Sequence, residues 1–253
     1  TLGRVQALFD QDGAPDAAIG SYDFQPGDSN FLSQYRNLLH AYVHQTASED
    51  ASTFWGGCGA IRRDIFLELR GFDTNRYKRP SIEDIELGYR LKTFGGRIHL
   101  DKQMMVTHFK RWTPANLVRT DVRDRGIPWM RLILQSGHMK ADLNLKIRDR
   151  ISVVLVYLML LGFAGILLTP FSLLISLVAA FSMLVLHRDL YRYFASHQGI
   201  RFMVYCLPWH WLYYFFNGIS FFVGIVLHLR DSLQGRLVPS ATPGGVSALE
   251  RSK

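Results

Sequence analysis

Two adjacent carboxylates, Glu83 and Asp84, lie in the segment SIEDIELGYRL, residues 81–91. The spacing of the apolar residues predicts a helix over 81–93 that begins close to both acids. The positive end of the helix dipole favours the ionised form of such side chains. An ionised carboxylate can accept the proton of an attacking hydroxyl group, as a general base does. The alternative is structural, because Ser81 and Asp84 have the spacing of a capping box.

A second candidate for chemistry is the segment HFKRW, residues 108–112. His108 is a possible metal ligand. Lys110 and Arg111 are cations suited to a diphosphate, and the indole of Trp112 offers a face on which a sugar ring can stack. The alternative is a basic, aromatic strand end at a membrane surface, where Lys, Arg and Trp collect.

Two weaker candidates accompany these segments. The glycine-rich stretch FWGGCGA, residues 54–60, precedes Arg62 and Arg63, and its glycines permit a ligand to approach the backbone closely. The alternative is a tight turn that binds nothing. His40 and His44 lie one helical turn apart, a spacing that can hold zinc. No third ligand is evident in the sequence, which favours a structural or acceptor-side role for this pair.

The elements that must position these residues alternate between strands and helices, which indicates an α/β domain. Strands are predicted at 17–24, 97–100 and 104–109, and helices at 31–44, 64–69 and 81–93. The chain opens in what resembles the end of a helix, residues 1–9. The hydrophobic strand and nucleotide-binding turn that begin such a sheet are not evident. We therefore expect the sequence to be the C-terminal part of a larger protein.

Charge divides the 253 residues into unequal parts. Residues 1–61 carry 2 basic and 7 acidic side chains, residues 62–150 carry 20 and 11, and residues 151–253 carry only 7 and 3. The hydrophobic content of 48% excludes a disordered chain. Because Cys58 and Cys206 are the only cysteines, a disulfide scaffold is excluded as well.

The last part of the chain has the composition of a membrane region. No charged residue occurs from Ile151 to Leu186, a run too long for a single span of about 20 residues. We predict spans at 151–168 and 171–187, separated at Thr169-Pro170, and a third at 202–228, in which Pro208 introduces a kink or a late start. The remaining residues, 229–253, are predicted to form a flexible tail.

Basic residues set the predicted orientation. They precede the first span at Lys140, Lys146, Arg148 and Arg150, and they precede the third at His187, Arg188, Arg192 and Arg201. Both flanks are therefore expected on the cytoplasmic side, with the Thr169-Pro170 turn outside. The tail is then also outside, although Arg230, Arg236, Arg251 and Lys253 depart from the rule there.

The motifs FWGGCGAIRR, IED and HFKRW, followed by amphipathic and apolar segments, resemble the membrane-bound family 2 glycosyltransferases. This family includes cellulose and hyaluronan synthases and polyprenyl-phosphate sugar transferases. The resemblance covers roughly residues 1–230. It implies a Rossmann-like GT-A domain that uses a nucleotide-sugar donor and a divalent metal, Mg²⁺ or Mn²⁺. Residues 1–112 would be the acceptor-side part of that domain.

The resemblance also implies roles for single residues. Asp84 would be the general base, with Glu83 as its neighbour in the motif. Donor-diphosphate contacts fall to Arg111 and Lys110, and acceptor contacts fall to Trp112, Gly57, Cys58 and Gly59. Two departures, Ile82 for a Thr and His108 for a Gln, weaken the polymerising alternative, and His108 would help to hold the metal. The family's Asp-x-Asp metal motif is absent, since Asp10-Gln11-Asp12 lies in a predicted polar loop.

Residues 113–150 form a basic amphipathic stretch, which predicts an interfacial segment at the cytoplasmic membrane face. An ordinary packing helix is the alternative. Next to apolar spans, the basic excess favours anionic lipid and nucleotide diphosphate as partners rather than nucleic acid.

We therefore expect an integral membrane glycosyltransferase of inverting type with its catalytic domain in the cytoplasm. It would transfer a sugar to a lipid-linked or polysaccharide acceptor, and this chain alone would be inactive. The alternative is a non-catalytic assembly or export partner derived from such an enzyme.

Overall fold

The first part of the chain forms one mixed sheet in the order β2-β4-β1-β3. A computed structural model describes residues 1–136 and 147–235. The strands are β1 (Ala17–Tyr22), β2 (Asp50–Ala51), β3 (Gly59–Ile61) and β4 (Ile98–Val106). β1 pairs in parallel with β4 and antiparallel with β3, while β2 pairs antiparallel with β4. The predicted α/β class is confirmed, whereas the GT-A fold in particular stays a prediction.

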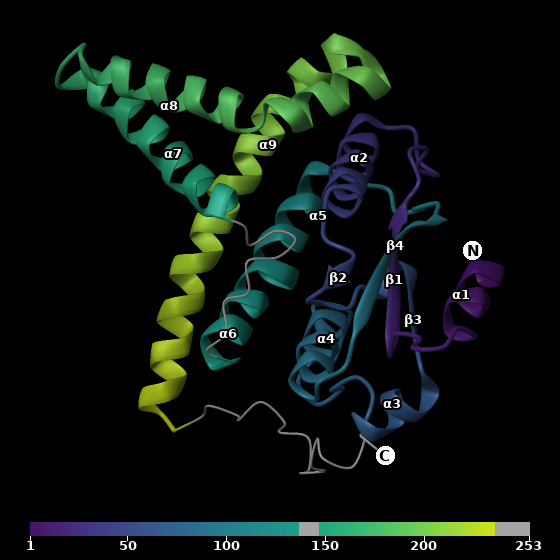
Figure 1. Cartoon of the computed structure of the whole chain (residues 1–253). Helices are drawn as coiled ribbons and strands as arrows, with labels where there is room; N and C mark the ends of the chain where they lie inside the picture. Colours follow the sequence, from purple (N-terminus) through teal and green to yellow (C-terminus); the bar gives the residue numbers. More distant parts are fainter. Residues whose placement is uncertain (137–146, 236–253) are drawn as a thin grey trace.

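Helices cover the sheet on two sides. α1 (Leu2–Phe9) lies on one side, and α2 (Phe31–Gln45) and α4 (Glu83–Thr93) lie on the other, with the short α3 (Arg63–Glu68) near one end (Figure 1). Every residue of β1 is buried, and Ile19 packs in one core cluster with Leu87 and Leu91 of α4. Burying these apolar side chains holds α4 against the sheet.

β4 is one continuous strand, although two short strands were predicted on either side of residues 101–103. The polar residues there suggested a break, but the folded chain gives them partners. Asp101 forms an ion pair with Arg4 of α1 at 2.8 Å, and the backbone oxygen of Lys102 accepts a hydrogen bond from Gln45 of α2. The strand therefore continues through residues 101–103, where the periodicity of the sequence alone predicts that it is interrupted.

The start of α4 lies beside the glycine-rich turn because Gly88 allows close packing. A β-carbon at Gly88 would overlap the backbone nitrogen of Phe54. The helix begins at Glu83, two residues later than predicted, and Ile82 is its N-cap residue without a side-chain cap. This packing brings the two predicted motifs, IED and FWGGCGA, to the same place.

A nearly continuous helical segment follows the sheet: α5 (Pro114–Arg119), the π-helical turn η2 (Thr120–Gly126) and α6 (Ile127–Ser136). Thr113 and Asn116 form a reciprocal capping box at its start. The segment packs closely on α9 (Arg188–Leu233), since a β-carbon at Gly224 of α9 would lie 2.7 Å from Met130. The predicted interfacial stretch 113–150 thus includes packed helices, and its residues 137–146 lie outside the described part.

The apolar part of the chain forms long helices. α7 (Ile147–Ala164), the short η4 (Gly165–Leu167) and α8 (Ser172–Leu186) make a hairpin that projects away from the sheet (Figure 1). By length and composition, Ile147–Leu167 and Arg188–Leu233 qualify as membrane spans. The predicted second span, 171–187, coincides with α8, which is shorter than those two helices.

α9 corrects two details of the prediction. Its backbone leaves the helical conformation at Gly199, where φ is 83°, while Pro208 lies inside the helix. Glycine adopts this positive φ without steric cost. The break that was expected near Pro208 therefore lies at Gly199. The helix also continues to Leu233, beyond the predicted tail boundary at 229, and residues 236–253 lie outside the described part.

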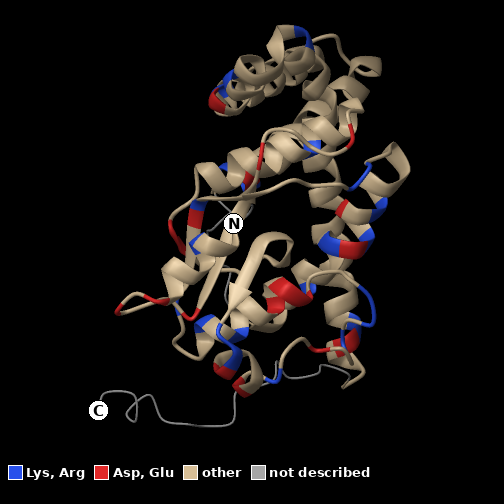
Figure 2. Cartoon of the chain, turned by 90° about the vertical axis from the view of Figure 1, so that its right-hand side faces the viewer, with Lys and Arg blue, Asp and Glu red and all other residues tan. Residues whose placement is uncertain are grey.

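Charged residues follow this division of the structure. Figure 2 shows blue and red segments spread over the α/β part and long uncoloured stretches in the upper helices. The exposed side chains of α7 and α8 include large apolar residues such as Leu161, Leu174 and Phe181. A large exposed apolar surface of this kind is typical of a region that a membrane or another protein covers.

Candidate functional site

The Asp84 carboxylate is held by two backbone N–H groups. Gly56 donates to one oxygen at 2.9 Å, and Ile85 donates to the other at 2.8 Å. Burial raises the pKa of Asp84 above its ordinary value, while the Gly56 hydrogen bond and the charge of Arg125 act in the opposite direction. The carboxylate is thus oriented and remains basic, which is what a general base requires.

Glu83 has a local role in this geometry. Its carboxylate accepts a hydrogen bond from the backbone N–H of Ser81 at 2.6 Å, and the Ser81 hydroxyl donates to the backbone oxygen of Asp124. The alternative, a capping box between Ser81 and Asp84, is not formed, because Ile82 is the N-cap residue and Asp84 accepts from Gly56. Of the two adjacent carboxylates, only Asp84 reaches the glycine-rich turn.

Packing accounts for the glycines of that turn. A β-carbon at Gly57 would lie 2.6 Å from the ring of Trp55, and one at Gly59 would lie 2.6 Å from the ring of Phe54. Cys58 is buried in the core of the sheet, with its sulfur 3.6 Å from the backbone oxygen of Met104. Burial raises the pKa of this thiol, which lowers the share of the reactive thiolate form.

Tyr22, at the end of β1, is the centre of an aromatic cluster that the sequence did not indicate. Its ring stacks on His108 with centroids 4.3 Å apart and meets the edge of Trp55 at 4.6 Å. Trp55 in turn contacts His44 at 4.3 Å, and His40 stacks on Tyr22 at 5.9 Å. The two histidines of α2 therefore join the same site as His108.

These histidines are neutral near pH 7. Burial lowers the pKa of His44 to about 4 and, together with the positive charge of Lys110, lowers the pKa of His108 to about 4. The pKa of His40 is lowered as well, mainly by burial and then by Arg36. A neutral imidazole can accept a hydrogen bond or bind a metal ion.

The side chains of Lys110, Arg111 and Trp112 have different surroundings. The Lys110 ammonium lies 3.8 Å from the ring centre of Trp112. Trp112 is buried, and its backbone N–H donates to the Ser33 hydroxyl at 2.8 Å. Arg111 is exposed and lies 3.7 Å from the carboxylate of Asp28. Of the two predicted diphosphate ligands, Lys110 lies on the Trp112 side of the site, whereas Arg111 lies at the surface.

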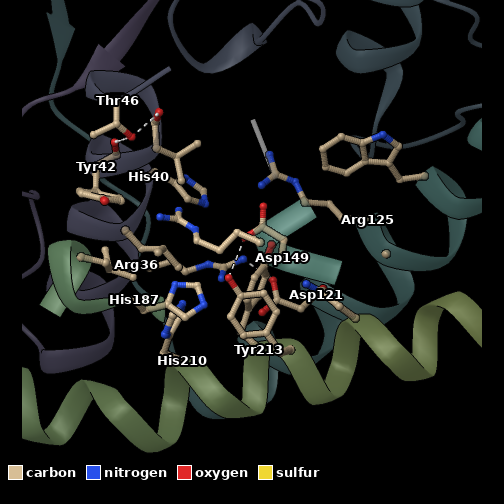
Figure 3. Close-up of a pocket in the computed structure, with 18 residues that line it drawn as sticks. Arg36, His40, Tyr42, Thr46, Asp121, Arg125, Asp149, His187, His210 and Tyr213 are labelled. Carbon is tan, nitrogen blue, oxygen red and sulfur yellow. Dashed lines mark hydrogen bonds and ion pairs between the residues drawn. The ribbon is translucent and has the colours of Figure 1, made fainter. Parts of the chain in front are cut away.

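Arg125 is the charged residue that sequence reasoning missed. It lies on η2, and its positive charge lowers the pKa values of Asp84, His108 and Lys110. Within the described residues, its side chain forms no ion pair or hydrogen bond. Figure 3 shows its guanidinium directed toward the side of the cavity that carries His40. An unpaired cation in this position attracts an anion.

The cavity in Figure 3 has a volume of about 70 Å³ and lies between α2, η2 and α9. One wall holds the buried ion pair of Arg36 and Asp121. Deeper in the wall, the Tyr214 hydroxyl donates to the carboxylate of Asp149 at 2.8 Å. Polar groups therefore connect the sheet part of the site with the first residues of the apolar helices.

The described residues include one candidate ligand, His108, for the divalent metal that the resemblance implies. In residues 1–136 and 147–235, no group of three or more His, Cys, Asp or Glu side chains is placed to hold a metal ion. Mg²⁺ prefers several oxygen ligands, and both oxygens of Asp84 already accept backbone hydrogen bonds. His108 is a neutral imidazole that stacks on Tyr22 in the site. It stays the predicted metal ligand, although no second ligand of the described residues joins it in a group of three or more.

The arrangement combines a fixed basic carboxylate, neutral imidazoles and an unpaired guanidinium. Together these groups can remove a proton from a hydroxyl and stabilise a negative leaving group. Comparison of the chain with protein-family models, with curated proteins and with solved structures finds no match, so the resemblance to family 2 glycosyltransferases rests on the motifs alone.

Proposed function

We propose that this chain is the acceptor-side part of an inverting glycosyltransferase that works at a membrane face. The observation that carries the proposal is the placement of Asp84. Two backbone N–H groups orient its carboxylate, burial raises its pKa, and the unpaired charge of Arg125 acts on it. This is the pairing of a base with an anion-stabilising group that in-line glycosyl transfer requires.

The proposed step is a single displacement at the anomeric carbon of the sugar. Asp84 accepts the proton of the acceptor hydroxyl, whose oxygen forms a bond to the anomeric carbon of a nucleotide-sugar. The bond between that carbon and the phosphate oxygen breaks, and the nucleoside diphosphate leaves with the electron pair. Arg125 and Lys110 stabilise the departing negative charge. The divalent cation implied by the resemblance would draw ligands from other residues, with His108 beside it, and would add positive charge at the diphosphate.

We assign the acceptor to the part of the site that contains Trp112. Its buried indole, stacked by Lys110, is fixed next to the Arg36 guanidinium at 5.4 Å from the ring centre. A lipid-linked or glycan acceptor would approach along η2 and α6, which connect this wall with α9. Gly57 and Gly59 contribute by allowing the tight turn that presents Gly56 to Asp84.

The test is Asp84→Asn in the native-length protein in its membrane. We expect sugar transfer to fall by about 10²–10⁴-fold, the usual contribution of a general base, while nucleotide-sugar binding stays within about twofold. The matched control is Glu83→Gln, because Glu83 contacts the backbone of Ser81 rather than the glycine turn. Retained turnover in the Asp84 variant contradicts the assignment, and a wild-type protein that binds no nucleotide-sugar supports the non-catalytic alternative.

We further propose that α7, α8 and α9 embed the protein in the inner or plasma membrane with the α/β part in the cytoplasm. Support comes from two helices of spanning length and composition and from basic residues that flank them, such as Arg148 and Arg192.

Labelling with a membrane-impermeant maleimide tests this orientation. A cysteine in place of Phe171, which is 80% exposed at the α7–α8 turn, should react in intact cells. A cysteine in place of the exposed Arg70 should react only after permeabilisation. The native Cys58 and Cys206 are buried and give little background. The reverse pattern of labelling would show that the orientation is inverted.

A further inference from the structure

A second cavity lies on another face of η2 and α6, where the loop that leads into α4 packs against them. Its volume is about 730 Å³, within the range of about 300–1,000 Å³ that small-molecule sites occupy. Its charged lining consists of Arg76, Lys78, Arg79, Arg123, Arg131, Asp73 and Asp124. Positive side chains thus outnumber carboxylates around an opening of ligand size.

Carboxylates neutralise only part of this excess, since Arg131 forms an ion pair with Asp231 of α9, which lies outside the lining. Asp124 is shared, since Arg79 lies 3.7 Å and Arg119 lies 3.5 Å from its oxygens. Lys78 and Arg123 are exposed, and neither forms an ion pair within the described part of the chain. Two cations at the cavity therefore have no fixed negative partner there.

Other groups of the lining are oriented or unsatisfied. Arg76 donates to Gln135 of α6 and lies 5.5 Å from the ring centre of Tyr77, so its guanidinium is held in place. The Tyr77 hydroxyl and Nε of Arg131 are buried and have no hydrogen-bond partner in the described residues. Buried polar groups usually find a hydrogen-bond partner, and the Asp124 Oδ1 oxygen of the same lining has none either within the described residues.

We propose that this cavity binds a phosphate-bearing anion. Guanidinium groups match phosphate oxygens in a forked, bidentate geometry, and an ammonium adds a point charge. Ser81 also lines the cavity. Its backbone N–H donates a hydrogen bond to the carboxylate of Glu83, the first residue of α4. A bound anion would therefore fix the segment that leads into α4. The proposal does not depend on glycosyl transfer, because it concerns a site separate from Asp84 and Arg125.

The test measures binding of inorganic pyrophosphate by calorimetry on the detergent-solubilised native-length protein. Arg125→Gln serves as the background, so that the candidate active site does not contribute through its guanidinium. Adding Lys78→Gln and Arg123→Gln should then weaken pyrophosphate binding at least about tenfold, since two charge-assisted contacts are lost. Both side chains are exposed, and these substitutions should leave the melting temperature unchanged.

The matched control replaces Arg63 and Arg201 by Gln in the same background, which removes the same net charge from exposed positions elsewhere. Equal weakening in the control pair would show that only the overall charge matters and would overturn the proposal. Unchanged affinity in the Lys78 and Arg123 variant, or no pyrophosphate binding in the Arg125→Gln background, would overturn it as well.

Lipid nanodiscs distinguish the two sources of such a phosphate. If an anionic lipid headgroup occupies the cavity, discs that contain phosphatidylglycerol should lower the apparent pyrophosphate affinity relative to neutral discs, and the Lys78 and Arg123 substitutions should abolish that difference. If the ligand is a soluble phosphate compound, the affinity should be the same in both kinds of disc and should still depend on Lys78 and Arg123.

Discussion

Arg36 and Arg125 line the same cavity, but the protein compensates only one of the two charges. Arg36 of α2 forms an ion pair with Asp121, and both side chains are almost completely buried. Two aromatic rings, Trp112 and Tyr213, lie 5.4 Å from its guanidinium. Arg125 lies four residues after Asp121 and has no such partner within the described residues.

The difference indicates that the Arg36 charge stabilises the fold, whereas the Arg125 charge is available to a ligand. A buried ion with a matched partner and stacked rings is held in one geometry, which joins α2 to η2 across 85 residues of sequence. An unpaired cation at a cavity wall keeps its capacity for a ligand. The π-helical form of η2 places both Asp121 and Arg125 toward this region, and such turns are frequent at functional sites.

The largest expected effect comes from breaking the buried pair. Asp121→Asn leaves the Arg36 charge without its counter-ion in a dry environment, and we expect the free energy of unfolding to fall by about 3–5 kcal/mol. Arg111→Gln is the matched control, because its pair with Asp28 is exposed and longer, at 3.7 Å, and it should cost less than about 1 kcal/mol. Thermal and denaturant unfolding of the detergent-solubilised protein measures both.

A double variant sharpens this test. Replacing Arg36 and Asp121 together by Leu removes both charges, and buried pairs exchanged for apolar residues often lose little stability. The double variant should therefore be more stable than Asp121→Asn. A double variant as unstable as the single one would show that the rings and hydrogen bonds around Arg36, rather than its charge balance, determine the stability of this joint.

The same comparison shows what sequence reasoning can reach. The helices that contain Tyr35 and Leu87 follow from regular apolar spacing. Asp84 could be proposed as a candidate because its motif is local, and its role stays a prediction. The Arg36–Asp121 pair is not visible in a periodic pattern, because its partners come from distant segments. In RTDVRDRG, nothing distinguishes Arg125 from Arg119 or Arg123. Only the folded chain shows that Arg119 lies beside Asp124 and that Arg125, of these three arginines, lines the cavity between α2, η2 and α9.

The positions of two other candidate residues depend on tertiary packing in the same way. The sequence favoured Arg111 for the diphosphate because it belongs to the HFKRW motif, but the extended chain after β4 turns Arg111 outward and Trp112 inward. Cys58 was placed near the acceptor, yet packing under Gly20 and Met104 holds it in the core. Motif membership predicts neighbourhood along the chain, whereas the direction of each side chain depends on tertiary packing.

The smaller expected effect, and the one that tests the available charge, comes from Arg125→Gln. Stability should change by less than about 0.5 kcal/mol, because no partner is left unpaired. The KM for the nucleotide-sugar should rise about tenfold or more with the loss of one charge-assisted contact. Arg119→Gln, which removes an exposed arginine just before η2, should leave the KM unchanged. A loss of stability equal to that of Asp121→Asn would contradict an available charge.

The pH profile adds a readout that a purely structural role would not move. In the proposed mechanism transfer requires ionised Asp84, so the rate should fall as pH decreases through the pKa of this carboxyl, which burial raises above its ordinary value. The positive charge of Arg125 lowers that pKa, and its removal must raise it. The acidic limb of the rate profile should therefore move to higher pH in Arg125→Gln and stay in place in Arg111→Gln. An unmoved limb in Arg125→Gln would separate Arg125 from Asp84, and the unpaired guanidinium would then belong to the cavity alone.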